Sequence, residues 1–390
     1  MRAFPFIFIA AMLSNLTACV QSSPNDSNTK SSPAGVKGPV VSVESDKANS
    51  VADLDDIEID YSQRQLVKFL NSRKQQLDLY LARQRELSAE RRNVLQAELN
   101  AVESSLGDRE SAHARAVKLF RETMVELELL QGRFPLGLIG AAQTALTRGD
   151  DSMATVLFQK YLKAKGNQPA LAGRAAFRAG RLAENRIDFT KAYAFYQVAI
   201  ASRPDNPKYL NDAAYMAQRL SRFAEAETYY LRALAILEES YGEQQAAIAT
   251  VLNGLAATYE IQQRYDAAEP KYLRVLDIKT KIFGPDHPEL AGALKNLAVV
   301  YEIQRRLDKA ESYHLRALAI QQRAFGPDHP EVAATKVNLA LFYLQQNRPE
   351  KAKPIAEEAE RVFRMEFGPA HPKTDASRKL LMLIERATRS

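Results

Sequence analysis

The sequence FGPDHP at residues 283–288 returns unchanged at residues 325–330 and, as FGPAHP, at residues 367–372. Each copy begins 42 residues after the one before it. Self-similarity at a fixed period is typical of proteins built from stacked units, each of them one supersecondary motif. The 42-residue period therefore predicts a repeat architecture for the C-terminal half of the chain.

Residues inside the period keep the same register. Leucine–alanine pairs occur at 255–256, 297–298 and 339–340, and alanine returns at positions 268, 310 and 352. Ala192 and Ala226 are 34 residues apart, which is the standard spacing of a tetratricopeptide repeat. Two antiparallel helices cannot bury their apolar faces alone, so neighbouring units are expected to stack and share a core.

The pattern predicts an all-α solenoid of tetratricopeptide-repeat hairpins, preceded by a long helix or a helical hairpin. We place the solenoid at residues 169–372, a degenerate repeat at 133–168 and a capping helix at 373–390. Gly284 and Gly326 are placed to end the second helix of their repeats. Asp286 and Asp328, each three residues before a glutamate, are expected to cap the next helix. The last copy has Ala370 instead, so its helix is expected to be weaker.

The repeats resemble the kinesin-light-chain class of tetratricopeptide repeats. A Leu-x-Asn-Leu-Ala core, an Ala-Glu-x-x-Tyr second helix and the Gly-Pro-Asp-His-Pro connection carry the resemblance, closely over residues 249–372 and more loosely over 171–248. In this class the asparagine before Leu-Ala resembles a clamp for a peptide backbone, since an amide both donates and accepts. The resemblance implies partner binding at Asn296 and Asn338. In the preceding repeat Gly254 departs from the pattern and weakens the clamp, and the adjacent Asn253 is expected to contact the partner there.

Further polar residues extend this expected partner-binding face. Lys295 is expected to meet acidic groups, and Glu260 and Glu302 lie two turns along the same face. All of them would be ordinary solvated side chains if nothing binds there. An extended peptide and a helix laid into the groove are both compatible with the pattern.

The N-terminus predicts export and lipid attachment. Residues 1–18 have a basic start and an apolar run too short to span a bilayer, as in a signal peptide. The end of this segment with Cys19 resembles the lipobox of bacterial lipoproteins, which implies a lipid on the only cysteine of the chain. Val20 in place of aspartate favours the outer membrane. Residues 19–52, poor in large apolar side chains, are expected to be a disordered tether.

Residues 53–131 are expected to form a long helix or helical hairpin. The stretch 57–106 contains no glycine or proline and is rich in helix-favouring residues. A heptad of apolar residues begins there, so self-association through residues 57–106 as a coiled coil is one alternative. One of the two seam positions then becomes polar, which disfavours a dimeric coiled coil. The other alternative is a fold-back at residues 106–108 onto a helix at 109–131.

Several function classes find no support in the sequence. No motif for a catalytic nucleophile, a phosphate loop or a metalloprotease is present, so no enzyme, cofactor or metal is expected. His287, His329 and His371 are expected to be turn residues, and His314 a packed core residue. Basic residues are spread along the chain, although the net charge is +6, so no nucleic-acid partner is expected. The pattern favours a lipid-anchored scaffold of the bacterial envelope that binds proteins or peptides; a structural spacer acting through the N-terminal helices is the alternative.

Overall fold

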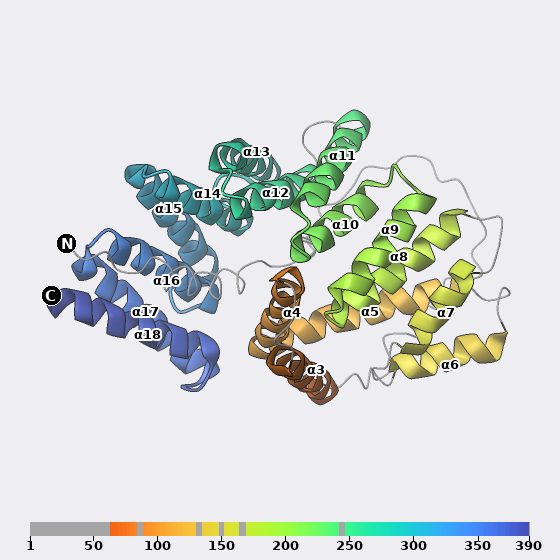
Figure 1. Cartoon of the computed structure of the whole chain (residues 1–390). Helices are drawn as coiled ribbons and strands as arrows, with labels where there is room; N and C mark the ends of the chain where they lie inside the picture. Colours follow the sequence, from red (N-terminus) through yellow and green to blue (C-terminus); the bar gives the residue numbers. More distant parts are fainter. Residues whose placement is uncertain are drawn as a thin grey trace, which may run out of the picture. The chain divides into compact units, whose positions relative to one another are not determined.

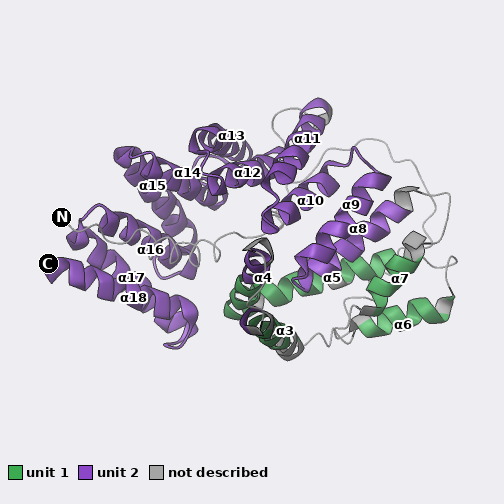
Figure 2. Cartoon of the chain, in the orientation of Figure 1, with its two compact units in different colours: residues 1–80, 99–164 green, residues 81–98, 165–390 purple. Residues whose placement is uncertain are grey.

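The computed structural model describes residues 63–83, 89–129, 135–147, 152–163, 169–241 and 246–389. The described residues form helices and turns without a strand, which confirms the expected all-α class. The chain divides into two compact units, residues 1–80 with 99–164 and residues 81–98 with 165–390 (Figure 2). None of the helices in the described stretches is long and apolar enough to cross a membrane.

Among the described residues, five helices precede the repeats: α3 (Gln63–Arg83), α4 (Ala89–Gly107), α5 (Arg109–Leu129), α6 (Leu136–Thr147) and α7 (Ser152–Lys163). Within the first unit, the Lys74 ammonium lies 2.6 Å from the Glu103 carboxylate and so links α3 to α4. Helical backbone bonds continue across the interruption at Asp108, from the Asp108 amide to the Ser104 carbonyl and from the Ala112 amide to the Asp108 carbonyl, so the fold-back expected there stays a prediction. Helices α6 and α7 pack together in the segment expected to be a degenerate repeat. Self-association through residues 57–106 stays a prediction.

Five helix pairs follow, α8 with α9 through α16 with α17, and each pair packs on the next (Figure 1). We call the first member of a pair its A helix and the second its B helix. Their bounds are α8 (Pro169–Asn185), α9 (Phe189–Ser202), α10 (Pro207–Arg219), α11 (Phe223–Tyr241), α12 (Ala246–Ile261), α13 (Tyr265–Phe283), α14 (Ala291–Ile303) after a 3-10 turn at Pro288–Leu290, α15 (Leu307–Phe325), α16 (Pro330–Gln345), α17 (Pro349–Phe367) and the final α18 (Pro372–Arg389).

Small residues in fixed register let the helices approach closely. The recurring B-helix alanines at positions 192, 226, 268, 310 and 352 are all fully buried, as are the A-helix alanines at 214, 256, 298 and 340. Large side chains fill the space between, and Tyr196, Tyr230 and Tyr272 occupy one register position on successive B helices with 2% exposure or less. The repeat register therefore defines a continuous core through this unit.

The turn within each pair contains a residue in the left-handed region. These are Ile187, Ser221, Gln263, Arg305 and Asn347, with φ between 56° and 61°. In the third pair the Arg264 amide donates to the Tyr259 carbonyl over 2.8 Å, a Schellman-type closure of the A helix. Glycine is the usual residue at such a position. None of these five residues is glycine, so the sequence did not indicate the left-handed turns.

Helix α18 differs from the A helices at the register position of their buried alanine. Met382 of α18 stands 42 residues after Ala340, and its side chain is 47% exposed whereas Ala340 is fully buried. A B helix could not approach a methionine as closely as it approaches alanine. Helix α18 packs on α17 and α16, and its capping role stays a prediction.

Candidate partner-binding site

The recurring connection holds successive pairs at a fixed geometry. Gly284, Gly326 and Gly368 have φ between 84° and 90°, which L side chains rarely adopt, and end their helices as expected. The phenylalanine before each glycine stacks on the histidine after it, with ring centroids 4.9, 4.8 and 4.5 Å apart. The motif therefore forms a corner of the same geometry in all three copies.

Histidine, rather than the expected aspartate, caps the following helix. The Nδ1 atoms of His287 and His329 accept from the backbone amides of Glu289 and Glu331 over 3.2 and 3.1 Å. The expectation that Asp286 and Asp328 are the caps was wrong, because their carboxylates pair instead with Arg323 and Arg361. The last copy keeps its cap, since His371 accepts from the Lys373 amide over 3.1 Å, so Ala370 does not remove it.

A tyrosine, an arginine and a glutamate join each long repeat to its predecessor. In one joint the Tyr343 hydroxyl donates to Glu311 over 2.8 Å and the Arg348 guanidinium lies 3.0 Å from the same carboxylate. Arg348 also lies 5.1 Å from the centroid of the Tyr343 ring. Burial and the bond to Glu311 raise the pKa of Tyr343 to about 12. The two earlier joints, which also stack and pair their members, are Tyr259–Arg264–Glu227 and Tyr301–Arg306–Glu269.

The asparagines expected to bind a partner come together on adjacent A helices. The Asn296 amide of α14 donates to the Asn253 side-chain oxygen of α12 over 3.3 Å. Asn338 of α16 lies one repeat further and is half-buried. The bond between Asn296 and Asn253 uses the oxygen of Asn253 and one N–H group of Asn296, so it leaves both N–H groups of Asn253 and the oxygen and second N–H of Asn296 with hydrogen-bonding capacity for a ligand.

Gly254 departs from the asparagine pattern for a steric reason. A Cβ atom at this position would lie 2.4 Å from Cζ of Tyr230 and 2.5 Å from its hydroxyl oxygen. The Tyr230 ring therefore occupies the space that a side chain at position 254 would need. The asparagine face accordingly begins at Asn253 and extends towards α16.

Glu260 and Glu302 bond to B helices of their own repeats. The Tyr272 hydroxyl donates to Glu260 over 2.8 Å, and His314 Nε2 lies 2.5 Å from Glu302. Burial raises the pKa of Glu260, against the effect of the tyrosine bond. His314 is 1% exposed, which confirms its expected place in the core. These bonds hold both half-buried carboxylates, whose partner-binding role stays a prediction.

Lys295 of α14 and Asp212 of α10 are buried side chains of A helices. Lys295 is 6% exposed, and burial lowers its pKa against the attraction of Glu331. Asp212 stands 42 residues before Gly254, in the register of Asn296 and Asn338, and the sequence interpretation missed it although the period places it there. Burial raises the pKa of Asp212 to about 6, while Arg181, 3.8 Å away, acts in the opposite direction.

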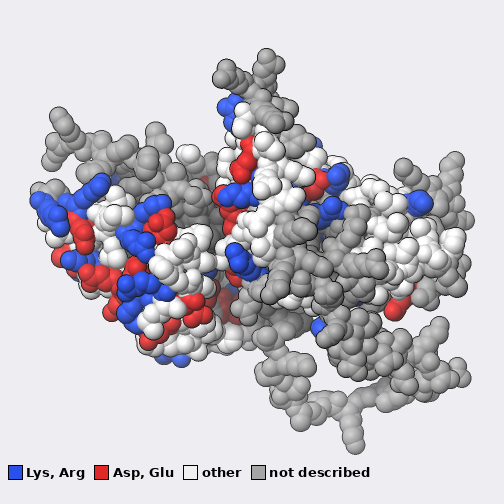
Figure 3. Space-filling view, turned by 90° about the horizontal axis from the view of Figure 1, so that it is seen from below, with Lys and Arg blue, Asp and Glu red and all other residues white. Residues whose placement is uncertain are grey.

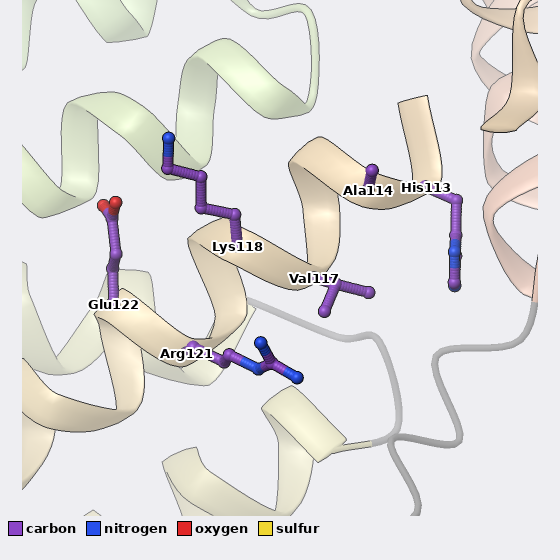
Figure 4. Close-up of a pocket in the computed structure, with 6 residues that line it drawn as sticks. All are labelled: His113, Ala114, Val117, Lys118, Arg121 and Glu122. Atoms are coloured by element: carbon purple, nitrogen blue, oxygen red, sulfur yellow. The ribbon is translucent and has the colours of Figure 1, made fainter. Parts of the chain in front are cut away.

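Other features of the described residues give weaker evidence for a binding site. A shallow hollow of about 570 Å³ lies against α5 (Figure 4). Basic and acidic side chains of that helix line it together with apolar ones: His113, Ala114, Val117, Lys118, Arg121 and Glu122. Acidic and basic side chains are interspersed over the described part of the face in Figure 3. In the described stretches, no three His, Cys, Asp or Glu side chains form a group that could hold a metal ion. Cys19 lies outside the described residues.

Comparison with known proteins identifies the repeat. Residues 205–281, 247–313 and 289–365 match the family model of the tetratricopeptide repeat. The chain thus carries tetratricopeptide repeats over residues 205–365, as the 42-residue period predicted. No curated protein matches the sequence.

Several solved structures are similar to part of the chain. BtubC (BKLC) from P. vanneervenii is 24% identical, with 57% of this chain and 91% of that chain covered and a TM-score of 0.47. Nearly identical TPR-like repeats from Podosopora anserina are 17% identical, with 52% and 99% covered and a TM-score of 0.47. YrrB, described as a TPR protein with an unusual peptide-binding site, is 17% identical, with 60% and 98% covered and a TM-score of 0.39.

Proposed function

We propose that this protein is a lipid-anchored interaction scaffold of the bacterial cell envelope that binds partner proteins or peptides along its A helices. The observation that carries the proposal is the hydrogen-bonded pair Asn296–Asn253, with Asn338 one repeat further. Primary amides on successive A helices offer donors and acceptors to the backbone of an extended segment, whatever its side chains are. The described helices hold this face through buried side chains, and this arrangement supports binding.

The binding part of the proposal is tested by selecting displayed random peptides on the exported body with Cys19→Ser. Selected peptides should lose about tenfold or more in affinity when Asn296→Ala and Asn338→Ala are combined, since each amide removed leaves peptide groups without a partner. Gln197→Ala, which removes an exposed amide from the B helix α9, is the matched control and should bind normally. Equal affinity of all three proteins would exclude the asparagine face.

The anchoring part of the proposal rests on Cys19 and on the segment before it. Each buried methylene of an acyl chain contributes about 0.8 kcal/mol, so two or more chains hold a protein at a membrane stably. Cells grown with an alkyne-tagged palmitate analogue should label the wild-type protein and not Cys19→Ser, which should leave the membrane fraction. A Cys19→Ser protein that stays with membranes would show that something other than the lipid anchors it.

A further inference from the structure

Two isoleucines are exposed where the A helices end and the turns within the pairs begin. Ile261 ends α12 and Ile303 ends α14, and their side chains are 54% and 45% exposed. The residues at this position in the A helices before and after them are polar, Arg219 and Gln345. The fold therefore does not require an apolar side chain here, yet two successive repeats carry one.

Ile303 also lines a hollow of about 390 Å³ between the turns of two successive pairs. The other lining residues come from the turn after α12, from the start of α13 and from the residue after Ile303: Gln263, Arg264, Tyr265, Asp266, Ala267 and Gln304. A hollow of this size lies at the low end of the range that holds a small ligand. It is large enough to receive one bulky side chain of another protein.

The polar groups around the hollow already have partners. The Arg264 guanidinium lies 2.6 Å from the Glu227 carboxylate. The Gln304 amide donates to Asp266 over 3.3 Å and to Glu269 over 3.1 Å. Burying a polar group is costly only where it loses its hydrogen bonds. An apolar side chain can therefore displace water from the hollow while these groups keep their bonds.

A cation without a partner follows the hollow in the chain. Arg305 comes directly after Gln304, is exposed and has φ of 60°. Within the described stretches its guanidinium makes no ion pair and no hydrogen bond. The residues at the same place in the other four turns are uncharged: Ile187, Ser221, Gln263 and Asn347. The charge is therefore particular to the turn beside this hollow.

We propose that this turn edge is a second docking site, which takes a bulky apolar side chain of a partner protein in the hollow and pairs Arg305 with a carboxylate next to that side chain. Apolar anchors that fill a pocket supply most of the affinity of an interface, and charges at the rim add selectivity. The site uses none of the asparagines, so it goes beyond the proposed function. The chemistry it fits is an apolar residue followed by an acidic one.

The test uses three capped tetrapeptides, titrated by ligand-observed NMR to about 10 mM, well above a Kd of about 1 mM. The protein is the exported body with Cys19→Ser, Asn296→Ala and Asn338→Ala, so that the asparagine face does not contribute. Acetyl-Ala-Phe-Asp-Ala-amide presents a ring and a carboxylate. It should bind about threefold more tightly than acetyl-Ala-Phe-Asn-Ala-amide, which lacks the charge. It should bind about tenfold more tightly than acetyl-Ala-Ala-Asp-Ala-amide, which lacks the ring.

Three variants assign the two contacts. Ile303→Gln gives α14 the residue that α16 has at this position, so the fold should tolerate it while the peptide with ring and carboxylate binds about threefold or more weakly. Ile261→Gln is the matched control, because this isoleucine is exposed but does not line the hollow, and binding should be unchanged. Arg305→Gln, the residue of the preceding turn, should reduce the preference for aspartate to about one and keep the preference for the ring.

Any of four results overturns the inference: no binding of the peptide with ring and carboxylate, equal affinity for all three peptides, equal losses in Ile303→Gln and Ile261→Gln, or an aspartate preference that survives Arg305→Gln. Because the asparagines are replaced in every titration, none of these results bears on the asparagine face.

Discussion

Single residues of the recurring connection have separable roles that spacing alone could not assign. Aspartate and histidine are adjacent in the motif, and both can accept from a helix N-terminus. Stacking on the phenylalanine positions the histidine ring so that Nδ1 meets the amide, while the aspartate reaches an arginine of the next B helix. The position of the helix start was therefore predictable from the sequence, whereas the identity of its cap depended on a ring contact.

The cap assignment predicts unequal effects for two neighbouring substitutions. His329→Ala should lower the free energy of unfolding by about 1 kcal/mol, and His329→Asn should recover most of that because asparagine is also an effective cap. Asp328→Ala removes only an exposed ion pair, of the kind that contributes about 0–1 kcal/mol. Urea denaturation measures all three variants. A larger loss for Asp328→Ala than for His329→Ala would contradict the cap assignment.

Asp212 predicts a pH-dependent gain in stability on substitution. Its folded pKa of about 6 lies above the value of about 3.9 for an exposed aspartate, so the folded state binds the proton more tightly. The carboxyl group therefore supports the fold most at low pH, and this contribution is lost as the pH rises from about 4 to about 6. Asp212→Asn should thus stabilise the protein above pH 6, by about 1–3 kcal/mol, and progressively less towards pH 4.

Thermal unfolding between pH 4 and pH 8 checks this sign. Asp277→Asn is the control, because its carboxylate is 57% exposed and pairs with Lys281 on the same helix, so it should shift stability little at any pH. A gain for Asp212→Asn that does not grow between pH 4 and pH 6 would show that ionisation is not its cause.

At the scale of helices, the repeat register predicted which helix faces meet. It did not predict the orientation of the long side chains on those faces. The buried alanines and leucines followed from the period, since small residues must stand where helices approach. Glu260 and Glu302 occupy the predicted face, yet their carboxylates bond to Tyr272 and His314. The same period places a tyrosine at position 230, and only the packed structure reveals that its ring fills the space at Gly254.

The contact between Tyr230 and Gly254 predicts a steric coupling between α11 and α12. Gly254→Ala should destabilise the protein by about 1–3 kcal/mol, because its Cβ would overlap the tyrosine ring in a packed core. In a Tyr230→Leu background the same change should be nearly neutral, since the ring atoms it meets are gone. Gly292→Ala, in the open first turn of α14, is the matched control and should be neutral or slightly stabilising.

Urea denaturation of the two single variants and the double variant gives the coupling directly. Additive losses would contradict the steric explanation, because two independent sites have no shared contact to relieve. A cause other than the Tyr230 ring would then have to explain the glycine at position 254.

At the scale of the repeat stack, stability should depend on position along the chain. Each helix pair contacts its neighbours, so the stability of a solenoid is approximately a sum of unit and nearest-neighbour terms. Leu297 of α14 and Ile384 of α18 are both fully buried, one in the middle of the stack and the other at its end. Either substitution to alanine leaves a cavity costing about 2–5 kcal/mol, but the number of neighbours that lose support differs.

Native-state hydrogen exchange should therefore separate the two variants. Leu297→Ala should lower amide protection first in α13 to α16 and much less in α8 and α9. Ile384→Ala should lower protection in α17 and α18 and leave the protection of the helices that carry the asparagine face unchanged. A uniform loss of protection from α8 to α18 in both variants would instead mean that the repeats unfold as one cooperative body. Local unfolding would let partner binding at Asn253, Asn296 and Asn338 stabilise the middle of the stack selectively, because a ligand protects only the units it spans.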